Sequence, residues 1–263
     1  MAPAAPAPAL VRERRALLGV LLVAAAGGWV VVLRHAGGGS GHDDMAMGGV
    51  DLTMGMGAPL FLAMWMAMMV AMMFPAAAPM VLAFSRSQSR RGERGHPHVP
   101  TWVFLAPYLV VWLAFGGLGY LAALGFNRLV GDSAWAMDNV PRIAGALLVA
   151  AGLYQLTPLK RRCLTRCRTP LSFMLSYWRD GRRGAVEMGL RHGLFCLGCC
   201  WVLFLVLLPL GVMNVAAMVA VAALVLAEKV LPAGERVAAV AAVVLVGYGL
   251  VALAVPAALP TAV

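Results

Sequence analysis

GLFCLGCCWVLFLVLLPLGVM, residues 193–213, contains no charged side chain. A helix of about 20 apolar residues is long enough to cross the hydrocarbon core of a bilayer. Within that core, only helices and closed barrels satisfy their own backbone hydrogen bonds. The stretch is therefore predicted to span a membrane. The chain as a whole, 62% hydrophobic and 12% charged, has the composition of a membrane protein rather than of a soluble domain.

Six further apolar segments have a similar character. Their approximate ranges are 16–33, 58–84, 102–125, 140–158, 215–231 and 236–255. The sequence thus predicts an all-α protein, a polytopic transmembrane bundle of six to seven helices. The first segment follows an Arg-rich start and is expected to be an uncleaved anchor rather than a signal peptide, since no clear A-x-A site follows it. The segment 215–231 is short and is predicted either to span or to be re-entrant.

The basic residues indicate how the bundle is oriented. With the N-terminus in the cytoplasm, 18 of the 21 Lys and Arg residues fall on the inner side, and only Arg34, Arg128 and Arg142 fall outside. An excess of Lys and Arg in short cytoplasmic loops is the positive-inside pattern of multi-pass proteins. We therefore predict a cytoplasmic N-terminus and the bacterial cytoplasmic membrane. The net charge of +10 is explained by orientation and not by nucleic-acid binding, because no basic patch interleaved with aromatic residues exists outside the connecting loops.

The chain is predicted to have three parts. They are a tail, first helix and Met/His-rich outside loop (1–57), a metal-binding membrane domain (58–255) and a C-terminal tail (256–263). Within the domain, the inner segment 159–191 holds four large apolar residues at i, i+3, i+4 and i+7, namely Leu171, Met174, Leu175 and Trp178. That spacing predicts an amphipathic helix on the inner membrane surface.

The cysteines gather at the inner ends of two predicted spans. They are Cys163, Cys167, Cys196, Cys199 and Cys200. The first two follow the fourth span at i, i+4, which places them on one face of a helix. The other three begin the fifth span, with His192 one turn before them. A return of the chain through 170–190 would bring both groups to the same depth.

Five thiols on one side of the membrane indicate a metal site more than ordinary packing. The cytoplasm is reducing, so structural disulfides are not expected. Thiolates near many arginines are good ligands for soft metals, which favours Cu(I), with zinc as the alternative. We expect His192 as an accessory ligand and consider Glu228, a carboxylate at the inner end of the sixth span, as a further one. Redox chemistry, palmitoylation of Cys163 and Cys167, and packing stay open as alternatives.

The outside loop carries a second candidate copper site. It contains a histidine followed by two M-x-M pairs, that is His42, Met45, Met47, Met54 and Met56. Thioethers bind Cu(I), and they remain useful where thiols would oxidise. The loop is therefore interpreted as capturing copper, the alternative being a flexible loop that happens to contain methionine.

A methionine-rich stretch follows that loop, MWMAMMVAMMFPAAAPM at residues 64–80. Methionine in an apolar helix ordinarily provides adaptable packing. Because the stretch lies between the two candidate sites, a path of thioethers through the membrane is a second hypothesis.

Together with MWMAMMVAMMFPAAAPM, three motifs carry a resemblance to a known family: YQLTPLKRRCLTRCRTP, HGLFCLGCCW and GVMNVAAMVAVAALVLAEKVLP. The chain resembles, from about residue 58 to 236, a bacterial family of predicted metal-binding integral membrane proteins, a domain of unknown function whose members are sometimes labelled copper chaperones. The resemblance implies a polytopic fold and metal binding without an established reaction. The motif positions that it carries over are Cys163, Cys167, Cys196, Cys199, Cys200, Glu228 and Lys229.

The predicted function is copper handling by an integral membrane protein, as delivery or as transfer across the membrane. The expected partners are the lipid bilayer and either a membrane cuproprotein or a soluble copper carrier, and no nucleic acid. Whether the chain is an enzyme stays open, and catalysis is the less favoured interpretation, since no Walker loop, HExxH motif or nucleophile elbow is present. Two alternatives remain: a membrane thiol–disulfide oxidoreductase using Cys199–Cys200 or Cys163–Cys167, and a structural subunit of a membrane enzyme complex, which could itself contain copper.

Overall fold

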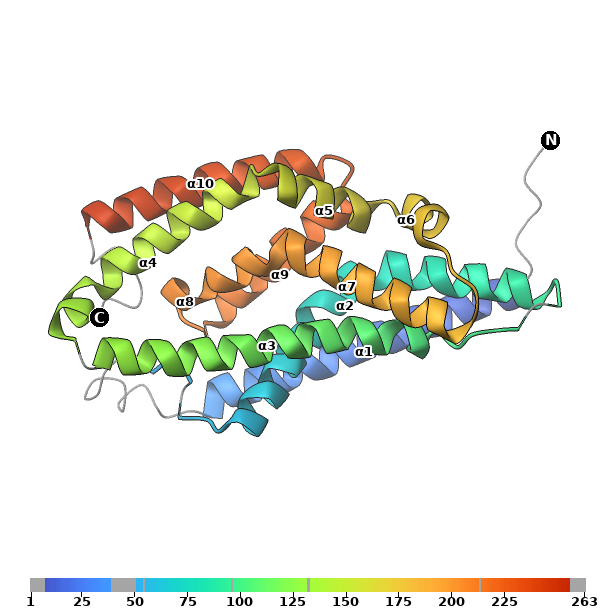
Figure 1. Cartoon of the computed structure of the whole chain (residues 1–263), viewed down its shortest axis with the longest axis horizontal. Coiled ribbons are helices and arrows are strands. Elements are labelled where there is room, and N and C mark those ends of the chain that lie inside the picture. The colour runs from blue at the N-terminus through green and yellow to red at the C-terminus, as the bar shows by residue number, and fades with distance from the viewer. Residues whose placement is uncertain are drawn as a thin grey trace.

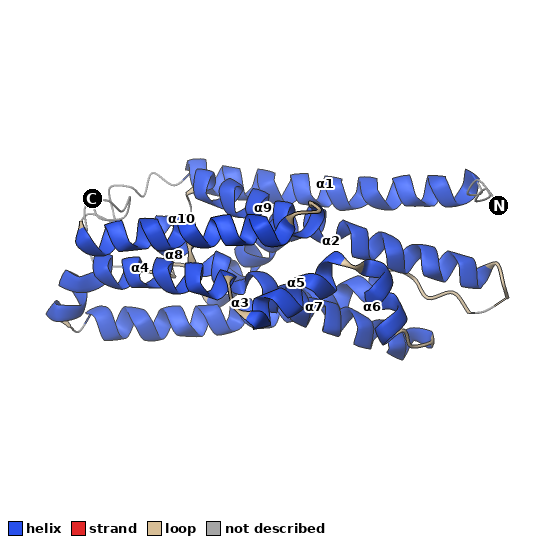
Figure 2. Ribbon diagram, turned by 90° about the horizontal axis from the view of Figure 1, so that it is seen from above, coloured by secondary structure: helices blue, strands red, loops and turns tan. Residues whose placement is uncertain are grey.

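The computed structural model describes residues 8–38, 51–53, 55–95, 97–131, 133–212 and 214–255, and most of this part of the chain is helical. The helices of this part are α1 (Pro8–Gly38), α2 (Ala58–Gly92), α3 (Trp102–Gly131), α4 (Ala134–Gln155), α5 (Pro158–Arg168), α6 (Pro170–Tyr177), α7 (Gly181–Leu205), α8 (Leu207–Leu210), α9 (Val215–Val230) and α10 (Gly234–Ala254). The long helices run roughly parallel to one another along the length of the molecule (Figures 1 and 2). The prediction of an all-α helical bundle is confirmed.

The described helices are those of a multi-pass membrane protein. Those long and apolar enough to cross a bilayer are Val11–Ala36, Ala58–Gly92, Trp102–Leu129, Gly181–Leu210 and Gly234–Ala254. A sixth span results if α4 and α5, bent by 61° at their junction, count as one broken span. Helix α9 has 16 residues. At 1.5 Å per residue it is about 24 Å long, shorter than a hydrocarbon core of about 30 Å.

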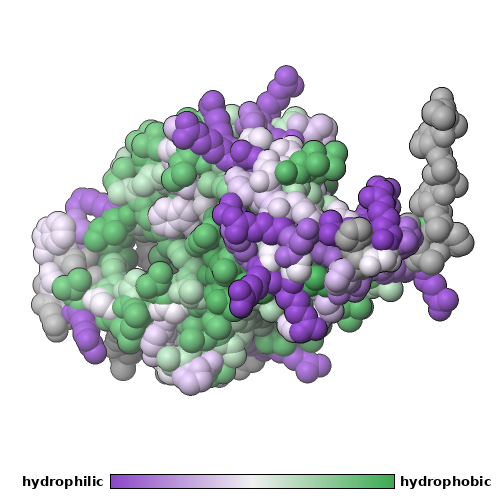
Figure 3. Space-filling view, turned by 45° about the vertical axis from the view of Figure 1, so that its right-hand side comes forward, coloured by the Kyte–Doolittle hydropathy of each residue, from purple (hydrophilic) through white to green (hydrophobic). Residues whose placement is uncertain are grey.

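The basic residues lie mainly at one end of the bundle. The start of α1, the end of α2, helices α5 and α6 and the start of α7 meet there (Figure 1). The hydrophilic side chains gather over this end, whereas most of the remaining surface in the same view is apolar (Figure 3). This distribution is the one that the positive-inside pattern leads us to expect, and the cytoplasmic N-terminus stays a prediction.

The bend between α4 and α5 has a local cause. Proline lacks a backbone N–H and is well accommodated at the first position of a helix, so Pro158 ends one helix and begins the next. The Thr157 side chain caps the new helix by accepting a hydrogen bond of 3.3 Å from the Lys160 N–H. The bend directs α5 toward α7, against which it packs.

Glycines allow two helix pairs to approach closely. A Cβ atom at Gly152 of α4 would lie 2.8 Å from the carbonyl oxygen of Ala242 in α10. A Cβ atom at Gly189 of α7 would lie 2.2 Å from the carbonyl oxygen of Phe104 in α3. Small residues at such contacts are typical of helices packed within membranes. The second contact holds the cysteine-bearing helix α7 against α3.

The inner segment 159–191 folds as α5, α6 and the first part of α7, and the stretch predicted to be an amphipathic helix corresponds to α6 and the residue after it. In α6, Leu171 is 73% exposed and Leu175 is also exposed, whereas Met174 is buried in the core. Trp178, just beyond α6, contacts Phe84 and lies under the guanidinium of Arg91. The four residues predicted to share one apolar face therefore divide between the protein interior and its surface.

Candidate metal centre

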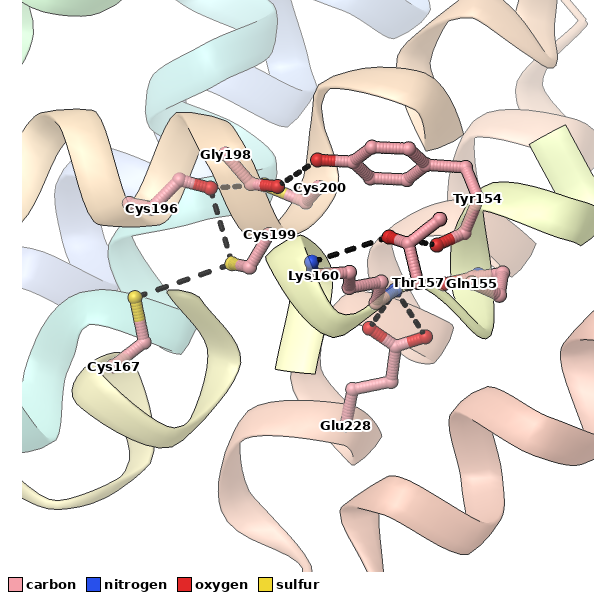
Figure 4. A network of polar contacts seen from close by, with 10 residues as sticks. All are labelled: Tyr154, Gln155, Thr157, Lys160, Cys167, Cys196, Gly198, Cys199, Cys200 and Glu228. Carbon is pink, nitrogen blue, oxygen red and sulfur yellow. Dashed lines mark hydrogen bonds and ion pairs between the residues drawn. The ribbon is translucent and has the colours of Figure 1, made fainter. Parts of the chain in front are cut away.

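The two cysteine groups meet inside the bundle. The Cys199 thiol on α7 points toward that of Cys167 on α5, with 3.9 Å between the sulfur atoms (Figure 4). All five cysteines, Cys163 included, are free and buried. The return of the chain that the sequence suggested does bring the two groups together.

The helix α7 fixes the arrangement of its three thiols. Cys199 and Cys200 lie three and four residues after Cys196, so their thiols reach back and donate hydrogen bonds to its carbonyl oxygen over 3.1 and 2.8 Å. Such back-bonding satisfies the thiols within the helix and turns them toward one side. Of these three, Cys199 is the one whose sulfur meets α5, at Cys167.

A glycine makes room for the fifth cysteine. A Cβ atom at Gly198 would lie 2.8 Å from the Cys163 sulfur, so a larger residue at this position would displace the thiol. The Gly198 carbonyl oxygen accepts a 2.5 Å hydrogen bond from the Tyr154 hydroxyl (Figure 4). Cys163 therefore lies against α7 beside the cluster.

A buried ammonium group faces the thiols. Lys229 of α9 is 7% exposed and donates a 3.0 Å hydrogen bond to the Cys196 sulfur. The Tyr108 hydroxyl of α3 lies 3.3 Å from the same sulfur. The ion pairs of the described residues include none for Lys229 with a carboxylate. Burying an unpaired charge is strongly unfavourable, so an anionic Cys196 sulfur is the group placed to balance it.

The neighbouring glutamate has a different partner. Glu228 accepts hydrogen bonds from Lys160 of α5 at both carboxylate oxygens, over 2.9 and 2.7 Å (Figure 4). Lys160 also donates to the Gln155 side chain, and Lys160 and Glu228 are each 1% exposed. The structure thus places Glu228, a predicted ligand, in an ion pair rather than among the thiols. Its neighbour in sequence, Lys229, instead faces the Cys196 sulfur.

His192 occupies an aromatic environment one turn before Cys196. Its ring stacks on Tyr108 and Phe104, with centroids 5.3 and 5.9 Å apart, and meets the edge of Phe173. Neither ring nitrogen has a hydrogen-bond partner among the residues that the structure describes. Its role as an accessory ligand stays a prediction.

Most of the outside loop lies beyond the described residues. This applies to His42, Met45, Met47 and Met54, so copper capture there stays a prediction. Met56 is described and is buried. The methionines of α2 are mostly buried in the core, which agrees with packing, and the thioether path stays a hypothesis.

The described end of that loop forms a turn attached to α3. The Asp51 carboxylate accepts hydrogen bonds from the Thr53 hydroxyl and the Gly55 N–H, and the Asn127 side chain donates to it over 2.5 Å. Burial alone raises the pKa of Asp51, but these hydrogen bonds outweigh it, and the pKa lies below its ordinary value. The loop is thereby anchored at the end of α3 remote from the thiols.

The cluster in this conformation is not a closed coordination sphere. No three His, Cys, Asp or Glu side chains of the described ranges converge in a way that could hold a metal ion. The sulfurs of Cys167 and Cys199 are spaced suitably to bind one metal ion together. A third sulfur would need a side-chain rotation.

Fold and site together define a multi-pass helical membrane protein with a buried thiol cluster at its basic end. The chain belongs to the PpoB2 family, described as a copper chaperone, whose family model matches residues 62–252. No curated protein and no solved structure shows significant similarity to the chain. The family confirms the resemblance inferred from the cysteine motifs and associates the chain with copper.

Proposed function

We propose that the chain holds Cu(I) between the sulfurs of Cys167 and Cys199 and passes it to an acceptor protein. The observation that carries the proposal is the 3.9 Å separation of these two sulfurs, which come from different helices. A metal–thiolate bond is about 2.3 Å long for zinc, and three such bonds in a plane place their sulfurs about 4 Å apart. The pair is thus spaced as two ligands of one ion.

The chemistry of the donors favours Cu(I) over zinc. Thiolates select soft ions, and Cu(I) is stable with two or three sulfur ligands. Structural zinc sites are nearly always four-coordinate, and the described residues offer no such set. Cys196 is the proposed third ligand, since it lies one helical turn before Cys199 on α7 and its sulfur would join the pair after a side-chain rotation.

The charge of the site also favours Cu(I). Two thiolates and one Cu(I) ion carry a net charge of −1, which the Lys229 ammonium would neutralise while Cys196 is a neutral thiol; a third thiolate would leave one negative charge uncompensated. The Lys160–Glu228 pair is neutral by itself and leaves this balance unchanged. Electroneutrality matters here because the surroundings are buried and apolar.

The proposed setting is the bacterial cytoplasmic membrane, with the thiol site near the cytoplasmic face. There it would deliver copper to a membrane cuproprotein or exchange it with a soluble carrier. The sulfurs are buried, so transfer requires α5 and α7 to part at the basic end. Capture by His42, Met45, Met47, Met54 and Met56 would form a separate step on the opposite side.

Anaerobic loading of the purified full-length chain with Cu(I) tests this proposal. We expect one tightly held Cu(I) per chain, and X-ray absorption should show two or three sulfur ligands without nitrogen. A first shell with fewer than two sulfur ligands, or no tightly held copper, would overturn the assignment of Cys167 and Cys199, whereas one added nitrogen would support His192 as the accessory ligand.

The same pair supports one other function, thiol–disulfide exchange. The structure pairs Cys167 with Cys199, and not Cys199 with Cys200 or Cys163 with Cys167 as first considered. An oxidoreductase would lose two titratable thiols in oxidising glutathione buffer without any metal. A thiol count that stays at five across these buffers would exclude this function.

Replacing Lys229 by methionine is expected to lower Cu(I) affinity about 10- to 100-fold, the range for groups that support metal ligands without binding the metal. The change removes the counter-charge while leaving every thiol in place. A competition assay with a coloured Cu(I) chelator measures the loss. Lys229→Arg keeps the charge and should recover most of the affinity, whereas equal losses in both variants would argue for a steric role of Lys229.

A further inference from the structure

A pocket of about 460 Å³ opens at the basic end, between α1, α2 and α6. It is separate from the thiol cluster, and its volume falls within the usual range for small-ligand sites. Arg14 of α1 and Arg86, Ser87 and Arg90 of α2 line one part of it, and Leu171 and Met174 of α6 line another. The pocket thus combines positive charge with an apolar wall.

The three arginines are available to a ligand. Arg14, Arg86 and Arg90 are exposed, and none forms an ion pair within the part of the chain that the structure describes. Glu13, the nearest acidic residue in sequence, instead accepts hydrogen bonds from the hydroxyls of Ser85 and Ser89. Arg91, next to Arg90, is paired with Asp180. The pocket therefore presents guanidinium groups that have no anion.

The polarity of the pocket changes along α2. Pro79, Leu82, Arg86 and Arg90 follow one another at helical spacing, so they form one strip on the same side of the helix. The strip is apolar toward the middle of the bundle and basic toward its end. It spans about 16 Å at 1.5 Å per residue, comparable to a lipid headgroup and the upper part of its acyl chains. A free phosphate would use only the basic half.

We propose that this pocket binds an anionic phospholipid, with the headgroup phosphate on Arg14, Arg86 and Arg90 and an acyl chain along Leu82, Leu171 and Met174. Guanidinium groups bind phosphate oxygens in bidentate fashion, whereas the Ser87 hydroxyl already donates to the Ala83 carbonyl oxygen. Basic pockets between helices on the cytoplasmic side are suited to anionic lipid headgroups. This inference is independent of the copper proposal.

Native mass spectrometry of the full-length chain in neutral detergent, titrated with phosphatidylglycerol or phosphatidylcholine, tests the proposal. We expect phosphatidylglycerol to bind more tightly, and R86Q/R90Q to weaken it about tenfold or more, since each basic residue near a membrane surface contributes measurably to anionic lipid binding. The matched control is R161Q/R162Q, which removes two exposed arginines of α5 outside the pocket and should change binding less than twofold.

Three results would overturn the lipid site. Equal losses in the two double variants would indicate a response to total charge alone. Equal binding of the two lipids would show that the arginines do not distinguish an anionic headgroup from a zwitterionic one. Displacement of phosphatidylglycerol by millimolar inorganic phosphate, with L171Q having no effect, would identify a free-phosphate site. Both double variants alter exposed side chains, so matching melting temperatures are expected and exclude misfolding.

Discussion

Cys167→Ser and Cys199→Ser are each expected to lower Cu(I) affinity more than about 100-fold, beyond the range found for supporting residues. Each variant removes one of two sulfurs only 3.9 Å apart, and a serine hydroxyl is a hard oxygen donor that Cu(I) binds poorly. The loss should be similar for both, although the residues are 32 positions apart on separate helices. Chelator competition under anaerobic conditions gives the affinity.

Two further variants calibrate that result. Thr165→Ala removes an exposed hydroxyl from the same helix as Cys167 and should leave the affinity unchanged within about threefold, the scale of a surface substitution. The loss of Cu(I) affinity in Cys163→Ser should lie between that of Thr165→Ala and that of Cys167→Ser, because Cys163 lies beside Gly198 at the edge of the cluster. Copper binding that survives C167S but not C163S would place the ion elsewhere among the thiols.

The location of the thiols could be predicted from the sequence, because span length, charge distribution and helix periodicity determine it. Apolar runs of span length predict membrane helices, and the basic residues place both cysteine groups at the same end. The spacing of Cys196, Cys199 and Cys200 follows from helix periodicity alone. The meeting of Cys167 with Cys199 additionally required a break after the fourth span, for which Pro158 was the visible signal.

The charged residues around the thiols could not be predicted from the sequence by these local rules. Lys160 was counted as one more cytoplasmic loop charge, whereas the bend after Gln155 carries it into the interior. Glu228 and Lys229 are adjacent, but neighbouring residues on a helix point about 100° apart, so the first reaches α5 and the second α7. Tyr108 carries no motif at all, since only the packing of α3 against α7 brings it to Cys196.

Glu228→Gln is expected to destabilise the protein by about 3–5 kcal/mol, the effect of removing one partner from a buried ion pair. Both oxygens of Glu228 accept hydrogen bonds from the Lys160 ammonium, and Lys160 is only 1% exposed, so water cannot take their place. The glutamine amide keeps the shape but leaves the charge of Lys160 unbalanced. Unfolding by sodium dodecyl sulfate in mixed micelles, followed by circular dichroism, measures the change.

The double variant Lys160→Met/Glu228→Leu separates charge from packing. Replacing a whole buried ion pair by apolar residues is often neutral or stabilising, so this variant should regain most of the lost stability. A double variant as unstable as E228Q would mean that the hydrogen bonds, including the one to Gln155, matter more than charge balance.

The Lys160–Glu228 pair also joins α5, which carries Cys167, to α9, which carries Lys229. If its role is only to hold these helices together, Cu(I) affinity should fall in E228Q and return in the double variant, in parallel with stability.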